Sequence, residues 1–106
     1  MKQGEVYLSA PSSFTGEREL RVIISSDAYN TRPGCVSVLV AEIETGTRLR
    51  PTQHGILTDY GGVRADRIVW FPLEMVGEQF GQISNEERSA VVEAKATSRL
   101  LVVLSA

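Results

Sequence analysis

The hydrophobic residues of this chain fall into short runs that are rich in β-branched side chains or alternate with polar residues, a pattern typical of β-strands. Gly, Pro, Ser, Asn and Asp separate the runs and indicate turns and loops. The pattern predicts five strands, at residues 4–9, 19–26, 35–43, 54–58 and 63–71. The third run, CVSVLVAEI, is the most apolar, so we expect that strand to be buried on both faces. A turn with a short helical piece is expected over residues 27–34.

The period of the pattern changes toward the C-terminus. Ser84 is followed three residues later by Glu87, which is a capping box, because each side chain is suited to bind the free backbone amide of the other. Val91, Ala94 and Ser98 then recur at helical spacing on one face. We therefore predict a helix from about residue 85 to at least residue 98, followed by an apolar end, LLVVLSA, that requires burial.

These elements predict a single domain over residues 1–106, mainly β with a C-terminal helix. Because the strands follow one another with no helix-length segment between them, we expect a strongly bent antiparallel sheet that forms a small barrel. No apolar run approaches the roughly 20 residues that span a bilayer. The N-terminus also lacks the apolar centre of a secretory signal, so we expect a cytoplasmic protein.

The composition limits the kinds of binding site that this chain can form. A net charge of −2 is unusual for a nucleic-acid-binding protein, but nine of the eleven basic residues are arginines, whose planar guanidinium suits phosphate and carboxylate. A local cationic groove is therefore compatible with an acidic chain. The single cysteine, Cys35, permits neither an internal disulfide nor a thiol metal cluster, so we expect it to pack, and we expect no metal and no cofactor.

Three charged residues interrupt the predicted strand VRADRIVWF. Along a strand, alternate side chains share a face, so Arg64, Asp66 and Ile68 are expected on one side. The other side would then carry Val63, Ala65, Arg67 and Val69. An arginine beside a carboxylate on one surface forms either an ion pair or a phosphate-binding site.

Five segments resemble, in the same order, the MazF/Kid/CcdB group of bacterial toxin–antitoxin toxins. They are GEVY at 4–7, RVIISSDAYN at 21–30, VSVLVAEIETG at 36–46, GVRADRI at 62–68 and GQISNEERSAVVEA at 81–94. Together these segments span nearly the whole chain. The resemblance implies the SH3-like antiparallel barrel of the group, a homodimer, and neutralisation by a cognate antitoxin.

The MazF and Kid branch of this group consists of metal-independent endoribonucleases, which arrest growth by cutting single-stranded RNA through attack of the 2′-hydroxyl. The resemblance to this branch implies that Arg64 and Asp66 are catalytic. Asp66 would act as the base, whereas Arg64 and Arg21 would stabilise the charged phosphorane. Thr45 would bind a phosphate oxygen. The basic side chains expected to bind the RNA are Arg18, Arg48, Arg50, His54 and Arg67.

Each of these residues also has an ordinary structural interpretation. Arg64 and Asp66 are compatible with an ion pair on a half-exposed face. A solvated position in a loop or at a strand end is the ordinary interpretation of Thr45, Arg48, Arg50 and His54. Exposed aromatic side chains can stack on bases, but we expect Tyr7 and Trp70 to pack in the core.

Departures from the ribonuclease branch leave a second function open. The branch usually has Arg-Pro at the start of its second strand, where this chain has Leu20 in place of the proline. It also tends to have Thr-Ser or Ser after its third strand, where this chain has Thr45 or Thr47 beside an unexpected Glu44. A decayed site would leave a non-catalytic binding protein. The segment MVGEQFGQISNEER, residues 75–88, resembles CcdB, which poisons DNA gyrase, but the Trp-Gly-Ile ending of CcdB is replaced here by Leu104-Ser105-Ala106.

Overall fold

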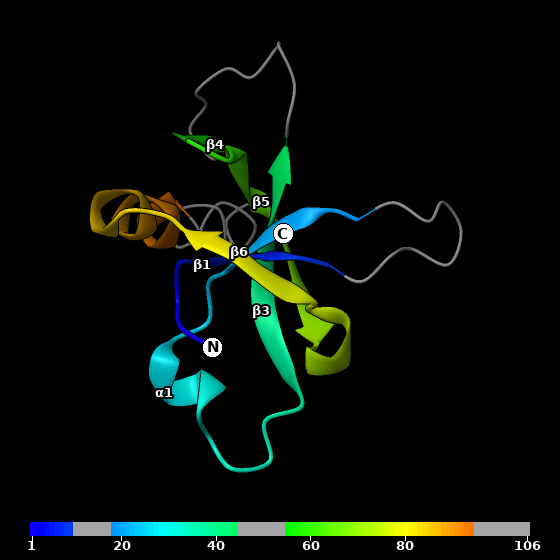
Figure 1. The fold of residues 1–106 in the computed structure, drawn as a ribbon. Helices are drawn as coiled ribbons and strands as arrows, with labels where there is room; N and C mark the ends of the chain where they lie inside the picture. Colours follow the sequence, from blue (N-terminus) through cyan, green and yellow to red (C-terminus); the bar gives the residue numbers. More distant parts are fainter. Residues whose placement is uncertain (10–17, 45–54, 95–106) are drawn as a thin grey trace, which may run out of the picture.

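The structure is a computed structural model that describes residues 1–9, 18–44 and 55–94, without the side chains of Leu57 and Asp66. Its elements in chain order are β1 (Glu5–Leu8), β2 (Leu20–Ile23), α1 (Asp27–Asn30), β3 (Ser37–Glu44), β4 (Gly55–Thr58), β5 (Gly61–Pro72), the 3₁₀ turn η1 (Leu73–Met75) and β6 (Glu78–Gln82) (Figure 1). Residues 85–94 form a further helix. All five predicted strands are present, as β1 to β5, and α1 confirms the short helical piece.

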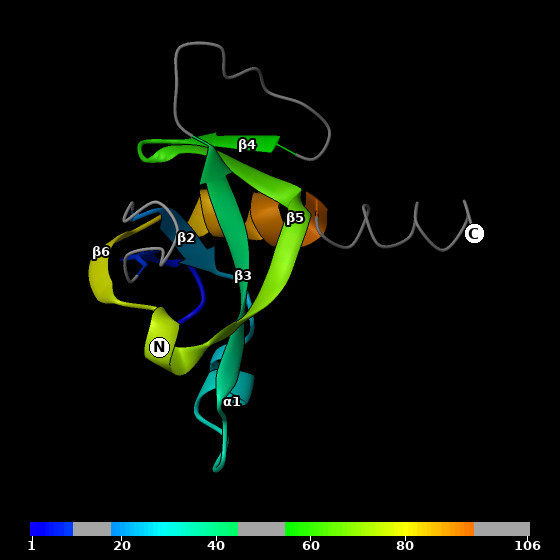
Figure 2. The same cartoon turned by 90° about the vertical axis from the view of Figure 1, so that its right-hand side faces the viewer.

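The six strands form one sheet in the order β4-β5-β3-β2-β1-β6, and all neighbouring strands are antiparallel. The prediction of a mainly antiparallel sheet with a C-terminal helix is therefore confirmed. Figure 2 shows that β5 bends strongly as it passes along β3 and continues through η1 toward β6. In the described part of the chain the sheet keeps two edges, β4 and β6, so a closed barrel stays a prediction.

The sequence pattern missed η1 and β6. Four of the five residues of β6 are exposed, so the segment lacks the apolar alternation that marks a strand. Its backbone nevertheless pairs with β1. Gly77 joins η1 to β6 with φ of 80°, and a Cβ atom there would collide with the carbonyl oxygen of Leu8, so this connection requires glycine.

Two apolar clusters cover the two faces of the sheet. The helix-side cluster consists of Val6, Val22, Ile24, Ala41, Ile43, Val63, Ile83 and Val91. The η1-side cluster consists of Ile23, Val38, Val40 and Val76. Because β3 contributes to both clusters, the predicted burial of this strand on both faces is confirmed. Cys35 packs against the η1-side cluster, as expected.

The helix over residues 85–94 begins at the predicted capping box. The Ser84 amide donates to Glu87 Oε1 at 2.8 Å, and the Glu87 amide donates to Ser84 Oγ at 3.1 Å. Val91 and Ala94 are buried, which fixes the apolar face of the helix against the sheet (Figure 2). Ser98 and the end of the predicted helix lie outside the described residues. No helix in the described ranges has the length and apolar character that crossing a membrane requires.

Two aromatic predictions have opposite outcomes. Tyr7 packs against the η1-side cluster, as expected. Trp70 is 57% exposed, so the prediction that it packs in the core is wrong. It lies on β5 opposite Leu39, and its described ring neighbour is Tyr29 of α1, with 5.4 Å between the ring centroids. One tilted ring covers only part of an indole, which leaves Trp70 at the surface.

Candidate functional site

A row of polar side chains crosses the η1-side face of the sheet. Residues directly opposite each other on antiparallel strands point to the same face. Tyr7 of β1 lies opposite Arg21 of β2, Arg21 lies opposite Glu42 of β3, and Glu42 lies opposite Arg64 of β5. The fold therefore brings together two predicted site residues, Arg21 and Arg64, which are far apart in the sequence, with Glu42 between them.

An insertion in β5 occurs at this row. Ala41 pairs with Ile68, so regular pairing would place the preceding residue of β5, number 67, opposite Glu42. Arg64 stands there instead, and residues 65–67 are inserted in β5 relative to β3. An irregularity of this kind bends a strand and changes the direction of its side chains.

Because of this insertion, the side chains of β5 do not alternate along the whole strand as the sequence predicted. Because three residues is an odd number, the faces are exchanged on passing the insertion. Arg64 pairs with Glu44 on the η1-side face, whereas Ile68 packs against the helix-side cluster, so the prediction that they share a face is wrong. The four residues predicted on the opposite side do not share one environment either. Val63 and Ala65 are buried, but Arg67 and Val69 are exposed.

Arg21 is the most enclosed of the paired arginines. Its side chain is 17% exposed, and its Nη2 donates to Glu19 Oε2 at 2.9 Å. The guanidinium carbon lies 4.5 Å from the centroid of the Phe71 ring, at cation–π distance. Its buried Nε has no hydrogen-bond partner among the described residues. Glu19 and Phe71 therefore fix the guanidinium, while one donor has no acceptor in the described part of the chain.

The two arginines of β5 face the glutamates of β3. Arg64 Nη1 lies 3.0 Å from Glu44 Oε2, and Arg67 Nη1 lies 3.8 Å from Glu42 Oε2. Glu42 and Glu44 are two residues apart on one strand, so their side chains share a face. Each of these four side chains is partly or well exposed, and such ion pairs are weak and readily exchanged.

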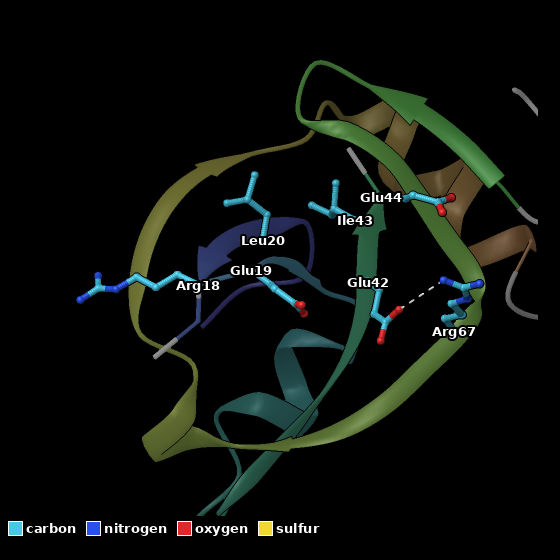
Figure 3. Close-up of a pocket in the computed structure, with 7 residues that line it drawn as sticks. All are labelled: Arg18, Glu19, Leu20, Glu42, Ile43, Glu44 and Arg67. Atoms are coloured by element: carbon cyan, nitrogen blue, oxygen red, sulfur yellow. Dashed lines mark ion pairs between the residues drawn. The ribbon is translucent and has the colours of Figure 1, made fainter. Parts of the chain in front are cut away.

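A depression of about 460 Å³ opens beside these pairs. β2 and β3 pair as far as Arg21 and Glu42, and the depression lies beyond that pair. Its lining residues are Arg18, Glu19, Leu20, Glu42, Ile43, Glu44 and Arg67 (Figure 3). The Glu19 side chain, just before β2, points toward β3, whereas the carboxylate of Glu42 points toward Arg67 of β5.

Arg18 differs from the other arginines of the depression. It is exposed, and Figure 3 shows it extending away from Glu42 and Arg67. None of the described residues forms an ion pair with it. Of the described arginines that line the depression, Arg18 therefore has its guanidinium available to an anion, whereas Arg67 is engaged by Glu42.

This surface is chemically suited to bind an anion that replaces a carboxylate on a guanidinium. Such an anion would be bound by the charge and the N–H donors of the guanidinium groups. Tyr7, in the same row, has a raised pKa, because burial and then the charge and hydrogen bond of Glu5 disfavour the phenolate. Its hydroxyl stays protonated and donates to Glu5 Oε1 at 3.2 Å.

Several predicted site residues lie outside the described residues: Thr45, Arg48, Arg50 and His54. Asp66 is described only by its backbone, within the insertion of β5. Conversely, sequence reasoning missed the roles of Glu19, Glu42 and Glu44 as arginine partners. Two glutamates at alternate positions of the most apolar strand were the available signal for the pair on β3. Among the described residues, no group of three His, Cys, Asp or Glu side chains is placed to hold a metal ion.

Comparison with known proteins identifies the fold. No protein-family model matches the chain, and no curated protein sequence matches it. Among solved structures, a mycobacterial endoribonuclease in complex with its cognate antitoxin is 20% identical, with a TM-score of 0.79 over 95% of this chain and 96% of that one. A second mycobacterial endoribonuclease is 19% identical, with a TM-score of 0.77 over 93% of this chain and 90% of the other.

A complex of MazE and MazF from Deinococcus radiodurans is 17% identical, with a TM-score of 0.70 over 91% of this chain and 92% of that one. At these identities the likeness establishes the fold. It confirms the resemblance in architecture that the sequence segments indicated.

Proposed function

We propose that this chain, which has the fold of the MazF toxins, is the toxin of a type II toxin–antitoxin pair and cuts single-stranded RNA without a metal ion. It acts in the cytoplasm as a homodimer and is neutralised by a cognate antitoxin. The single observation that carries this proposal is the row of Arg21, Glu42 and Arg64 beside an open depression, on a fold shared with endoribonucleases. Two guanidinium groups from different strands at one surface are suited to the charge of a phosphorane.

In this proposal the 2′-hydroxyl next to the cut phosphate attacks phosphorus and loses its proton to Asp66. Arg21 and Arg64 stabilise the negative charge of the phosphorane, and Thr45 binds one of its oxygens. The bond between phosphorus and the 5′-oxygen then breaks, and this leaving oxygen takes a proton from solvent. The products are a 2′,3′-cyclic phosphate and a 5′-hydroxyl. The flanking RNA is bound by Arg18, Arg48, Arg50, His54 and Arg67.

The antitoxin would occupy the same surface. Antitoxin tails in such systems are acidic and disordered, and they fold on contact with the toxin. A carboxylate of the tail would replace an RNA phosphate on the arginines, in the way that Glu19, Glu42 and Glu44 contact them within this chain.

The proposal is tested by incubating the purified protein with single-stranded RNA in EDTA and analysing the ends of the products. Fragments ending in a 2′,3′-cyclic phosphate are expected, and intact RNA would contradict the proposal. In cells, Arg21→Ala, Arg64→Ala and Asp66→Ala should each relieve growth arrest. Arg32→Ala is the matched control, because Arg32 is exposed beside Tyr29 of α1. Full toxicity of all three variants would place the site elsewhere.

One observation favours a second function, that of a non-catalytic binding protein of the same fold. The three described ion pairs place a carboxylate on each of Arg21, Arg64 and Arg67, an arrangement that a decayed phosphate site would also have. RNA that stays intact in the assay above, together with a DNA-damage response in cells, would support a gyrase poison instead of a ribonuclease.

A further inference from the structure

Three arginines of the candidate site are each engaged by a glutamate of the same chain. The pairs are Arg21 with Glu19, Arg64 with Glu44, and Arg67 with Glu42. A phosphate and a carboxylate bind guanidinium through the same N–H donors. Arg64 Nη1 already donates to Glu44 Oε2, and Arg67 faces the charge of Glu42 at 3.8 Å, which is an ion-pair distance without a hydrogen bond. An RNA phosphate that approaches either arginine therefore meets a carboxylate beside the guanidinium.

The two glutamates of β3 are held in place by their strand. Val40, Ala41 and Ile43, next to them in sequence, are buried, so the backbone that carries Glu42 and Glu44 is fixed in the centre of the sheet. These carboxylates can move away from the site only by a change of side-chain rotamer. Their negative charge stays close to any phosphate bound there.

We infer that Glu42 and Glu44 compete with an RNA phosphate for Arg67 and Arg64, and that they thereby weaken the binding of RNA to this surface. This inference rests on the proposed function and concerns how that site is regulated. The exposure of the side chains makes the competition reversible: Arg67 is 52% exposed and Glu44 46%. Exposed pairs contribute little free energy, so a phosphate displaces them at modest cost.

The competition also limits how many arginines the RNA can engage. Arg18 has no ion-pair partner among the described residues and extends away from Glu42 and Arg67, so it lies apart from this competition. Arg67 and Arg64 bind a phosphate when it replaces Glu42 and Glu44. Removing either glutamate should therefore increase affinity and also increase the number of phosphates that the protein neutralises.

The test uses a 2′-O-methyl RNA oligonucleotide, which has no attacking hydroxyl and so reports binding without cleavage. Its affinity for the full chain is measured by fluorescence anisotropy over a range of salt concentrations. The variants are Glu42→Gln, Glu44→Gln and the double substitution, since glutamine keeps the shape and removes the charge. Glu74→Gln is the control for net charge, because Glu74 is exposed on η1 and does not line the depression.

We expect each single variant to bind about two- to fivefold more tightly than the control variant. The double variant should have the steepest dependence on salt, with a slope increased by about 0.7 for each further phosphate neutralised. Affinities equal to the control, or weaker binding that indicates glutamates positioning the arginines for phosphate, would overturn the inference. If Arg64→Met still weakens binding in that case, the proposed function survives. If neither the wild type nor any variant binds RNA, both proposals fail.

Discussion

Replacing Arg21 by methionine separates the charge of this side chain from its packing. The aliphatic part of arginine packs in the way that methionine does, but methionine carries neither a charge nor an N–H donor. Arg21→Ala removes both the charge and the packing. Since Arg21 is largely enclosed beside Phe71, the two variants should differ in stability while losing the same chemistry.

The expected magnitudes follow from the contacts of Arg21. Its pair with Glu19, which is 62% exposed, contributes roughly 0.2–1 kcal/mol. Its cation–π contact with Phe71 contributes about 1 kcal/mol at this partial burial. Arg21→Met should therefore lower the free energy of unfolding by about 1 kcal/mol, offset in part because the unpartnered buried Nε is removed. Arg21→Ala also loses buried methylene groups at about 0.8 kcal/mol each, for a total of about 3 kcal/mol.

Urea unfolding measures the stabilities, and initial rates of RNA cleavage in EDTA measure the chemistry. Both variants should lose about 10²- to 10³-fold in kcat/KM, the effect of removing one donor to a charged transition state. Arg21→Met should nevertheless stay folded under the conditions of the cleavage assay.

Cleavage by Arg21→Met within tenfold of the wild-type rate would refute the assignment of Arg21 to charge stabilisation. If only Arg21→Ala lost activity, and in proportion to its loss of stability, Arg21 would be a packing residue. Glu19→Gln is the matched control, because it removes the ion pair and keeps the guanidinium.

Three further variants test the fold that carries this surface. Ser84→Ala removes one half of the capping box with Glu87 and should lower the free energy of unfolding by about 1 kcal/mol in urea, whereas an unchanged midpoint would show that the cap is unimportant. Gly77→Ala places a Cβ against the Leu8 carbonyl at φ of 80° and should destabilise by more than about 1 kcal/mol, a loss that thermal unfolding would detect and that a wild-type Tm would contradict. Tyr7 has a raised pKa in the folded state, so the folded chain binds the phenol proton more tightly and stability should fall as pH rises above about 10. Tyr7→Phe should make that fall shallower in urea titrations at successive pH values, and an identical fall in both proteins would contradict the assignment.

The sequence predicts the elements whose signals are local. The capping box and the spacing of Val91 and Ala94 define a helix without reference to the rest of the chain, and both are present. The runs that became β1 to β5 also carry their own apolar or β-branched pattern. β6 carries no such pattern, because a strand exposed at four of its five positions is stabilised by its pairing with β1 and not by burial.

The site is harder to predict because it depends on register. Alternation places Arg64 and Ile68 on one face only if β5 pairs without interruption, and the insertion at residues 65–67 reverses the faces. The partnership of Glu42 with Arg67 also depends on the insertion, because Glu42 is paired in register with Arg64 and Arg67 lies among the inserted residues. No local motif encodes this contact. The charge pattern of its own strand and the resemblance both point to Arg64, whereas Arg21 is predicted through the resemblance alone, and the sheet brings both beside Glu42.

The central claim is that the surface formed by β2, β3 and the insertion of β5 binds the RNA backbone. NMR spectra of the chain, titrated with the 2′-O-methyl RNA used above, test it most directly. We expect the largest changes in backbone amide signals at residues 18–21, 42–44 and 64–67. Changes confined to helix 85–94, or to the surface around Trp70 and α1, with these three segments unaffected, would contradict the claim.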